Sequence, residues 1–292
     1  MINYNPIINS IVYNGYHIGI LRLDLIHPEI SGNKWFKLKY NLQQVKKVNN
    51  TTVITFGGAF SNHIAATAVA CKLEGIKSIG IIRGEETSAD NPTLSLAKEN
   101  GMELLFVSRE EYSQKSDGAY MQRLRYMYPE AYIIPEGGDN FLGQKGCEEI
   151  LTTETNHYAT IFCAHGTGTT YKGISKSLLA NQELNVVNAL NFEAITSEPQ
   201  TTVFNNYHFG GYAKHTSELL EFKNWFEQTY HIELDYVYTA KLFFAAFDLM
   251  KQEKLDKQKS ILLIHCGGLQ GNVGYELRYN LKPKRQVKDA QG

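Results

Sequence analysis

Two lysines on one predicted helix face, Lys34 and Lys37, are the first residues in the chain whose spacing suggests chemistry. A helix that begins near Gly32 would place both ammonium groups on the same side, because they are three positions apart. Neighbouring cations repel each other, and repulsion or burial lowers the pKa of an amine. A lysine with a lowered pKa can form a Schiff base. For an arbitrary lysine pair, two solvated surface side chains are the simpler interpretation.

A glycine- and threonine-rich segment, residues 165–170 (HGTGTT), has the composition of an anion-binding loop. It follows a strand-like run and precedes a helical one. Backbone N–H groups, the hydroxyls of Thr167, Thr169 and Thr170, and the helix N-terminus would surround a phosphate. The segment lacks the GK[ST] ending of a Walker loop and the third glycine of GxGxxG. Taken alone, it is as well interpreted as a simple turn.

Three polar residues, Ser61, Asn62 and His63, also lie between a predicted strand and a predicted helix. Their hydroxyl, amide and imidazole groups suit a carboxylate or a ring substituent held at a helix N-terminus. The simpler alternative is that Ser61 only caps the helix. A Ser/His/Asp hydrolase fits poorly, because the chain has no GxSxG segment.

The elements that must position these residues alternate between strands and helices. A hairpin is predicted around Asn14-Gly15. The predicted strands are residues 7–13, 17–24, 51–56, 77–82, 102–107, 131–134, 160–164, 185–190 and 260–265. The predicted helices run from about 33 to 47, 64–75, 90–99, 116–128, 143–151, 170–181, 215–230 and 238–250, the last continuing to about 259. This alternation predicts mostly parallel sheets covered by helices, with ligands at the carboxyl ends of the strands.

Glycine-rich turns follow four of the predicted strands. They are Gly57-Gly58, Gly137-Gly138, Gly166 to Gly168, and Gly267-Gly268. Glycine lets backbone approach a ligand closely and leaves N–H groups accessible. We therefore expect these turns to meet around one ligand.

The composition is that of an ordinary globular protein: 292 residues, 43% hydrophobic and 20% charged, with a formal net charge of −1. This balance argues against a nucleic-acid partner or binding to an acidic membrane. The four cysteines are far apart, which argues against a zinc site and a disulfide scaffold, and we expect no metal. We find no signal-peptide pattern and no apolar run near the roughly 20 residues of a membrane span, so we expect a cytoplasmic protein.

Six short segments, taken together and in order, carry a resemblance to a known family. They are GNKWFKL (32–38), FGGAFSNH (56–63), PEGGDN (135–140), HGTGTT (165–170), YTAK (238–241) and HCGG (265–268). The set resembles the pyridoxal-phosphate enzymes of the tryptophan synthase β-subunit type. More narrowly, it resembles the 1-aminocyclopropane-1-carboxylate (ACC) deaminase and D-cysteine desulfhydrase family. The likeness spans roughly residues 20–280.

The resemblance implies an α/β fold with two three-layer αβα domains and mostly parallel open sheets, known as fold type II. Residues 1–44 and 156–292 would form the larger, cofactor-binding domain, and residues 45–155 a smaller inserted one. The cofactor would be pyridoxal 5′-phosphate, the substrate a small amino acid, and the assembly a homodimer.

The resemblance also implies catalytic roles. Lys34 would hold the cofactor as a Schiff base and carry a proton. Lys37 would help keep Lys34 deprotonated, or pair with a buried carboxylate or with the phosphate. Ser61 would receive the substrate carboxylate, and Tyr238 and Tyr212 would be active-site tyrosines beside the substrate.

The remaining implied roles are in binding. Asn62 would hydrogen-bond the ring hydroxyl of the cofactor, and Ser61 and His63 would hold the substrate carboxylate. The predicted cofactor-binding residues are Lys34, Asn62, Gly166, Thr167, Gly168, Thr169, Thr170, Thr239 and Cys266. The predicted substrate-binding residues are Asn33, Ser61, Asn62 and His63.

Two positions at which the chain differs from ACC deaminases bear on the substrate. Thr239 stands where ACC deaminases have glutamate, and Cys266 where the family has leucine or threonine. Neither side chain offers a carboxylate that would stabilise a protonated pyridine nitrogen. We therefore expect β-elimination from a β-substituted D-amino acid, with D-cysteine giving pyruvate, ammonia and sulfide, by a lyase, deaminase or hydrolase. ACC deamination, with Tyr238 opening the ring, is the alternative, and a catalytically idle cofactor or phosphometabolite binder is a third.

Overall fold

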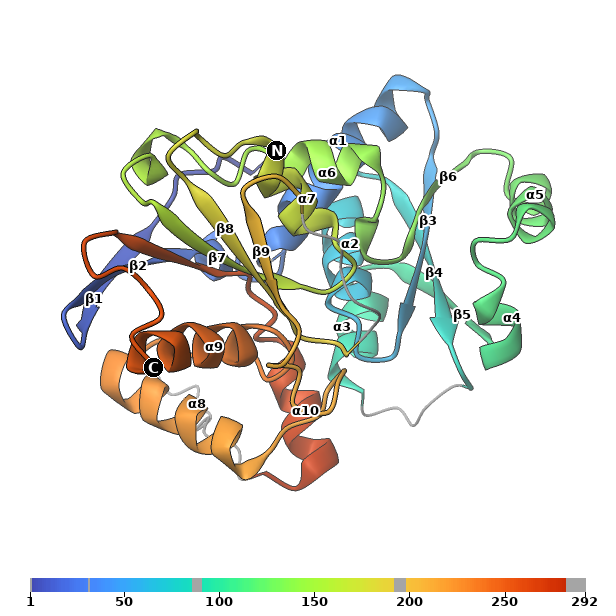
Figure 1. The fold of residues 1–292 in the computed structure, drawn as a ribbon. Helices are drawn as coiled ribbons and strands as arrows, with labels where there is room; N and C mark the ends of the chain where they lie inside the picture. The colour runs from blue at the N-terminus through green and yellow to red at the C-terminus, as the bar shows by residue number, and fades with distance from the viewer. Residues whose placement is uncertain (1, 31, 86–90, 192–197, 282–292) are drawn as a thin grey trace, which may run out of the picture.

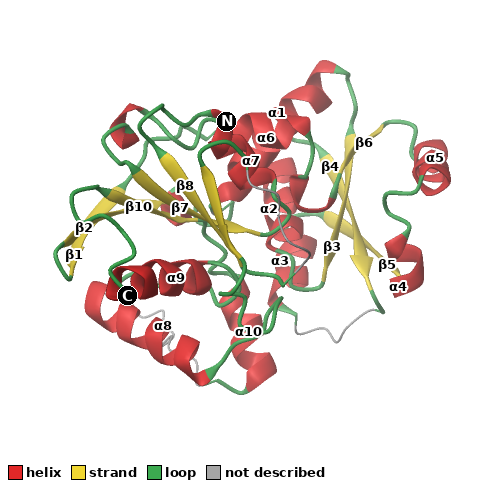
Figure 2. Cartoon of the chain, viewed as in Figure 1, coloured by secondary structure: helices red, strands yellow, loops and turns green. Residues whose placement is uncertain are grey.

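The computed structural model describes residues 2–30, 32–85, 91–191 and 198–281. Two sheets lie side by side, with helices between and around them (Figures 1 and 2). The six-stranded sheet has the order β1-β2-β10-β7-β8-β9, and the four-stranded sheet has the order β5-β4-β3-β6. All the paired strands run parallel except β1 and β2, which form an antiparallel hairpin. The predicted α/β class with mostly parallel sheets is confirmed.

The strands of the six-stranded sheet come from both ends of the chain, and those of the four-stranded sheet from its middle. The six are β1 (Ile8–Tyr13), β2 (Tyr16–Arg22), β7 (Thr160–His165), β8 (Glu183–Asn188), β9 (Thr201–Phe204) and β10 (Ile261–His265). The four are β3 (Thr52–Gly58), β4 (Lys77–Arg83), β5 (Met102–Val107) and β6 (Ala131–Ile134). The turn between β1 and β2 has positive φ at Asn14 (48°) and Gly15 (82°), as a two-residue hairpin requires.

Helices follow most of the strands. They are α1 (Asn33–Lys47), α2 (Asn62–Leu73), α3 (Pro92–Glu99), α4 (Arg109–Ser113), α5 (Gly118–Met127), α6 (Phe141–Cys147), α7 (Thr169–Lys176), α8 (Ser217–Tyr230), α9 (Thr239–Lys251) and α10 (Gly271–Tyr279). Three of these elements depart from prediction. α4 and α10 were not predicted, and α9 ends at Lys251 without the extension to 259. Residue 90, where one helix was predicted to begin, lies outside the described residues.

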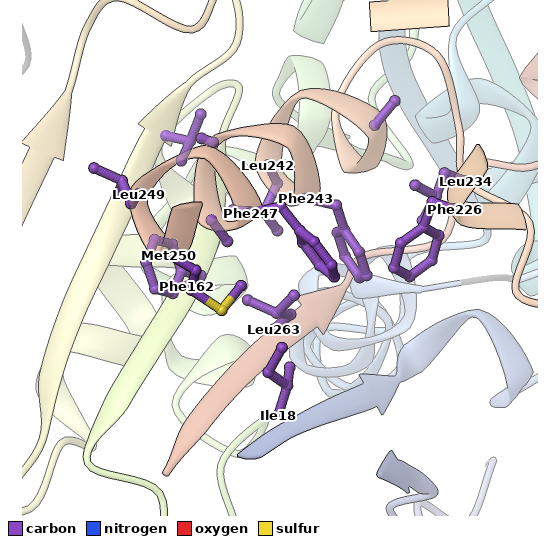
Figure 3. Packing of buried hydrophobic residues seen from close by; sticks show 14 of the residues in the cluster. Ile18, Phe162, Phe226, Leu234, Leu242, Phe243, Phe247, Leu249, Met250 and Leu263 are labelled. Carbon is purple, nitrogen blue, oxygen red and sulfur yellow. The ribbon is translucent and has the colours of Figure 1, made fainter. Parts of the chain in front are cut away.

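The largest core cluster lies between α9 and one face of the six-stranded sheet (Figure 3). Phe243, Phe247 and Met250 are buried side chains of α9, spaced by four and three residues. They pack in one cluster with Ile18 of β2 and Leu263 of β10. Burying an aromatic or aliphatic side chain of this size stabilises the fold by about 1.5–3 kcal/mol, so α9 is anchored firmly to the sheet.

Helix α1 joins the cores beside the two sheets. Its Leu38 and Leu42 pack in one cluster with Val53 of β3 and Val69 of α2. Phe36, on another side of α1, packs instead in a cluster with Ile264 of β10. The helix that carries both lysines of interest is therefore held by both sheets.

Candidate active site

A cavity of about 590 Å³ lies where the carboxyl ends of strands from both sheets meet. The four predicted glycine-rich segments all contribute to its wall, through Gly58, Gly137, Gly166, Gly168, Gly267 and Gly268. Gly57 and Gly58 were predicted to form a turn, but they are the last two residues of β3. The cavity is also lined by Asn33, Lys34, Lys37, Ser61, Asn62, His63, Thr167, Thr170, Tyr212, Tyr238 and Cys266. Thirteen of the fifteen residues predicted to form the site therefore lie on one cavity wall. The two exceptions are Thr169 and Thr239.

Gly32 explains how α1 comes to start at this cavity. Its φ of 72° belongs to the left-handed region, and a Cβ there would lie 1.7 Å from the carbonyl oxygen of Cys266. That carbonyl accepts a hydrogen bond from the backbone N–H of Asn33 at 3.2 Å. Only glycine fits this approach, and it brings the first turn of α1 against the turn that follows β10.

Lys34 and Lys37 both line the cavity, as their spacing predicted. The ammonium of Lys34 donates to Oδ1 of Asn33 at 2.7 Å, and Nδ2 of Asn33 donates to Oγ1 of Thr170 at 2.8 Å. Burial, followed by repulsion from Lys37, lowers the pKa of Lys34 to about 8. A large share of Lys34 is then an uncharged nucleophile at mildly alkaline pH. Burial also lowers the pKa of Lys37, whose Nζ donates to Oγ1 of Thr167 at 3.3 Å.

The segment 165–170 forms a loop at the N-terminus of α7. Gly168 is the N-cap with φ 95°, so the loop turns in the left-handed region just before the helix. Thr167 and Thr170 face the cavity, but Thr169 is fully buried outside its wall. The Thr169 hydroxyl donates to Oδ1 of Asp139 at 2.8 Å and lies 3.0 Å from the Thr167 hydroxyl. The side chain of Thr169 thus holds the loop in place, and its predicted contact with the cofactor stays a prediction.

Ser61 and Asn62 lie at the start of α2. Oγ of Ser61 accepts the N–H of Ile64 at 3.4 Å, so Ser61 caps the helix and also lines the cavity. Oδ1 of Asn62 is buried and has no hydrogen-bond partner among the described residues. A Cβ on Gly268 would lie 3.0 Å from Nδ2 of Asn62, so glycine there makes room for the amide. Asn62 is free to bind a polar group in the cavity.

His63 offers an acceptor to the cavity. The Thr55 hydroxyl donates to the carbonyl of Ile134 at 2.9 Å, so it accepts from Nε2 of His63, which lies 2.9 Å away. This network assigns the Nε2–H tautomer and leaves Nδ1 as a buried acceptor with no partner in the described part of the chain. Burial, then Lys34 and Lys37, lower the pKa of His63 to about 3. Because the unprotonated Nδ1 of His63 cannot donate a hydrogen bond to a carboxylate, this geometry does not fit the predicted role of His63 in binding the substrate carboxylate.

Tyr238 and Tyr212 supply two phenols to the site. A Cβ on Gly166 would lie 3.0 Å from the Tyr238 ring, which therefore packs on the glycine of the 165–170 loop. Tyr212 lines the cavity with 47% of its surface exposed. Burial raises the pKa of both phenols, so both keep their protons near neutral pH.

Asp235 is a cavity residue that the sequence did not reveal to us. Its carboxylate accepts the backbone N–H groups of Val237, Tyr238 and Thr239 at 2.9, 3.0 and 2.8 Å. The Thr239 hydroxyl donates to the same carboxylate at 2.7 Å, which is why Thr239 points away from the cavity. An aspartate three residues before a predicted helix is a capping signal that could have identified it.

Cys266 remains on the cavity wall, with 8% of its surface exposed. The neighbouring Cys163 thiol, and then Lys34, lower the pKa of Cys266 against the opposing effect of burial. The Cys266 thiol is therefore more acidic than its burial alone would allow.

Comparison with known proteins identifies the family. The model of the family described as pyridoxal-phosphate dependent enzymes matches residues 17–267. The chain belongs to this family. The predicted cofactor, pyridoxal 5′-phosphate, and the prediction of an enzyme are confirmed.

The relatives of this pyridoxal-phosphate enzyme include members of the narrower group that it resembles. A Thermotoga maritima protein, provisionally named 1-aminocyclopropane-1-carboxylate deaminase, is 31% identical over 88% of this chain and 90% of its own length. The mitochondrial bifunctional D-cysteine desulfhydrase/1-aminocyclopropane-1-carboxylate deaminase of Arabidopsis thaliana is 29% identical over 88% of this chain and 74% of its own. The resemblance stated from the six segments is confirmed. The description as a hydrolase is wrong, since these relatives are named as deaminases and a desulfhydrase.

Solved structures agree on the fold. A crystal structure of an ACC deaminase homologue superposes with a TM-score of 0.81 at 26% identity, covering 96% of this chain and 94% of the other. A hydrogen sulfide-producing enzyme from Fusobacterium nucleatum superposes with a TM-score of 0.68 at 15% identity, covering 91% of this chain and 96% of its own, and shows the fold alone.

The residues of the cavity fit the cofactor. A buried lysine with a lowered pKa suits its aldehyde, and the N-terminal loop of α7 suits its phosphate. The unpartnered Oδ1 of Asn62 and Nδ1 of His63 offer acceptors to its polar substituents or to the substrate.

Among the described residues no group of three metal-ligating side chains is found, and no helix is long and apolar enough to cross a membrane.

Proposed function

We propose that this enzyme is a lyase that removes the β-substituent of a small β-substituted amino acid. D-Cysteine is the simplest such substrate, and with one water taken up it gives pyruvate, ammonia and hydrogen sulfide. The observation that carries the proposal is at position 239. ACC deaminases have glutamate there, but this chain has Thr239, whose side chain has no carboxylate and whose hydroxyl is bonded to Asp235. Asp235 itself is held by three backbone N–H groups.

Lys34 is the residue we assign to the proton transfer. Its Nζ would hold the cofactor, and after the substrate displaces it the free amine would take the α-proton. An amine with a pKa of about 8 can accept and return a proton near neutral pH. When bound, the cofactor supplies an electron sink for the bonds at the α-carbon. The nearby Asn33 amide orients the amine through the 2.7 Å hydrogen bond.

Lys37 and the 165–170 loop would bind the phosphate. Lys37 already donates to Thr167, so its charge lies at the loop and close enough to lower the pKa of Lys34. Thr170 is held by Asn33, which links the loop to the residue beside the base. We assign Thr167 and Thr170 to direct contact and Thr169 to holding the loop through Asp139.

Ser61 and Asn62 would bind the carboxylate of the substrate and a polar group of the cofactor. Both lie at the positive end of α2, which favours an anion. His63 would instead accept a hydrogen bond from an N–H group, because its Nδ1 is an unprotonated acceptor. Tyr238 and Tyr212, both protonated, would donate hydrogen bonds to the substrate or its leaving group.

ACC deamination is the second candidate function. It is favoured by the names of the Thermotoga and Arabidopsis relatives. Tyr238 lies on the wall of the cavity and could act on the cyclopropane ring, which has no α-proton for Lys34 to remove.

A product assay separates these functions. Purified enzyme loaded with cofactor is incubated with D-cysteine or with ACC, and pyruvate, sulfide and 2-oxobutyrate are measured. We expect pyruvate and sulfide from D-cysteine, and loss of both in Lys34→Ala. 2-Oxobutyrate as the sole product would overturn the proposal in favour of ACC deamination. A protein that binds cofactor but turns over neither compound would support the idle binder for these substrates.

We also propose a cytoplasmic homodimer with the domain division 1–44 plus 156–292 and 45–155. The division is supported by the four-stranded sheet, whose strands all lie between Thr52 and Ile134. Light scattering should give about twice the chain mass of 33.0 kDa. A mass of one chain at assay concentration would refute the dimer.

A further inference from the structure

Two arginines reach the mouth of the active-site cavity from different elements. Arg83 is the last residue of β4, and Arg278 lies in the last turn of α10. Both line the same cavity as Lys34 and Ser61. None of the roles proposed above uses either guanidinium.

Arg83 extends toward the cavity across a glycine. In the parallel register of β3 and β4, Arg83 lies opposite Gly58, which itself lines the cavity. A Cβ on Gly58 would lie 3.6 Å from Nη2 of Arg83, so the guanidinium passes over this position. The Tyr112 ring lies 5.7 Å below the Arg83 guanidinium and supports it by a cation–π contact.

Arg278 is placed by the helical spacing of α10. Gly271, Gly274 and Arg278 are separated by three and four residues, so they share one face of the helix. All three line the cavity. A Cβ on Gly274 would lie 2.8 Å from the Phe60 ring, and one on Gly271 would lie 3.2 Å from Oδ1 of Asn62, so the glycines let this face pack closely against the start of α2. The Tyr279 ring lies 5.4 Å from the Arg278 guanidinium.

The charges around the mouth leave these two cations in excess. Lys115 also lines the cavity, but its Nζ lies 3.4 Å from a carboxylate oxygen of Glu136. Within the ranges that the structure describes, neither Arg83 nor Arg278 forms an ion pair. Burial raises the pKa of Tyr212; Arg83 and Arg278 oppose this effect, and the carboxylates of Asp235 and Glu136 add to it.

We propose that Arg83 and Arg278 form a second anion-binding subsite, and that the substrate is an amino acid whose β-substituent carries a negative charge. This rests on the proposed function, in which Ser61 and Asn62 bind the α-carboxylate and a polar group of the cofactor. Guanidinium groups bind carboxylate, sulfonate or phosphate oxygens through paired hydrogen bonds, which gives both affinity and orientation. The charged end of the β-substituent would lie between the arginines, with its bond to the β-carbon toward Lys34.

Binding of matched amino acids tests the subsite without requiring turnover. Calorimetry on the cofactor-loaded enzyme compares aspartate with asparagine and glutamate with glutamine, as both enantiomers. The members of each pair have nearly the same shape and differ by one negative charge. We expect the acidic member of at least one pair to bind roughly tenfold more tightly. Added salt should reduce this preference, because the arginines are exposed.

Substitutions test whether the two arginines cause the preference for the acidic amino acid. Arg83→Gln and Arg278→Gln should each reduce it several-fold while leaving the affinity for the neutral member unchanged. Lys115→Gln is the matched control and should have little effect, since Lys115 is already paired with Glu136. Cofactor absorbance in each variant reports that the site remains formed.

Three outcomes would overturn the subsite. They are equal affinity for the acidic and the neutral member of each pair, no binding of either member, and an equal loss of affinity for both members in the arginine variants. Equal loss would assign the arginines to the α-carboxylate. The pyruvate assay with D-cysteine is independent of these results. If pyruvate forms but the enzyme shows no preference for acidic amino acids, the proposed elimination is supported and the subsite is refuted. If acidic amino acids bind more tightly but no pyruvate forms, the subsite is supported and the proposed elimination of D-cysteine is refuted.

Discussion

Lys34 shows how neighbouring residues can tune one side chain. Its ammonium lies half-buried among Asn33, Lys37 and the turn at Cys266, and burial contributes more than the second lysine to its lowered pKa. The spacing of the two lysines therefore predicted only the smaller effect on the pKa of Lys34, which is repulsion from Lys37. The surroundings that bury the amine come from residues distant in the sequence.

The first prediction at this scale concerns the pH dependence of cofactor capture. Lys34 has a pKa of about 8, below that of an ordinary lysine, so the reactive neutral amine is depleted below pH 8 and predominates above it. The rate at which apoenzyme binds pyridoxal phosphate, followed by absorbance, should rise through pH 8. Lys37→Gln removes the repulsion and should move this rise to higher pH. A rise at unchanged pH in the variant would contradict the coupling.

A second residue-scale prediction concerns His63. Burial and the two lysines lower its pKa to about 3, so the imidazole should stay neutral from pH 5 to 8. Nitrogen NMR should show a protonated Nε2 and an unprotonated Nδ1, with the exposed His231 as the reference signal. Thr55→Val removes the acceptor at 2.9 Å and should weaken this preference for one tautomer. A doubly protonated ring at pH 6 would refute the assignment.

At the scale of elements, the site depends on how helices begin. α1 starts after Gly32, where only glycine fits against the turn that follows β10. α7 starts at the 165–170 loop, and α9 starts at a segment held by Asp235. The N-termini of α1 and α7 lie at the cavity, where the positive end of each helix favours an anion. The first N–H groups of α9 are instead bonded to Asp235. Lys241 of α9 adds a further link, because its ammonium donates to the carbonyls of Ala189, His208 and Gly211.

Gly32→Ala tests the start of α1. The added Cβ would lie 1.7 Å from the Cys266 carbonyl at a φ of 72°, so α1 or the β10 turn must move. We expect a loss of at least about 2 kcal/mol of unfolding free energy and weak retention of cofactor, measured by denaturant titration and absorbance. Gly118→Ala is the control, since it has normal φ and nothing within 4 Å of its Cβ. Equal stability of the two variants would contradict this account of Gly32.

Lys241→Met tests the link from α9 to residues 189–211. The substitution leaves three carbonyl groups without their donor, so we expect a loss of about 3 kcal/mol of unfolding free energy. Lys251→Met, at the exposed end of the same helix, should change it by less than about 0.5 kcal/mol. The substrate KM should also rise in Lys241→Met, because Tyr212 follows Gly211 directly. A loss of stability without a change in KM would limit Lys241 to a structural role.

At the scale of the whole molecule, the cavity lies between two sheets that have separate cores. Glycine turns from both sheets form its wall, and α1 packs into the clusters of both. Cofactor binding should therefore stabilise both halves together, because the residues that we propose to bind it, among them Lys34, Thr167 and Asn62, come from both halves.

Thermal unfolding with and without cofactor tests this coupling. At a hundred times its dissociation constant, pyridoxal phosphate should stabilise the folded protein by about 2.7 kcal/mol and raise the unfolding midpoint. Pyridoxal without the phosphate should have a smaller effect. The difference between the two should shrink when Thr167 and Thr170 are replaced by valine. An equal effect of both compounds on the unsubstituted protein would contradict the assigned loop.

Local sequence features determined much of this protein. The Asn14-Gly15 turn, the strand–helix alternation and three of the four glycine turns each depend on backbone preferences of neighbouring residues, and these predictions hold in the structure. The helix α10 escaped prediction because its two glycines weaken the helical signal, and the short strand β9 was also not predicted. Family resemblance, more than spacing, singled out Lys34.

Tertiary structure alone decided which of the predicted side chains face the cavity. Thr169 and Thr239 have the right types and positions, but the carboxylates of Asp139 and Asp235 draw their hydroxyls away. His63 is an acceptor because Thr55 holds its Nε2–H, and Arg83 and Arg278 line the same cavity only because the fold brings β4 and α10 to it. The bond between Thr239 and Asp235 is local, since these residues are four positions apart. The contact of Thr169 with Asp139 and the presence of both arginines at one cavity depend on distant parts of the chain, which no local pattern records.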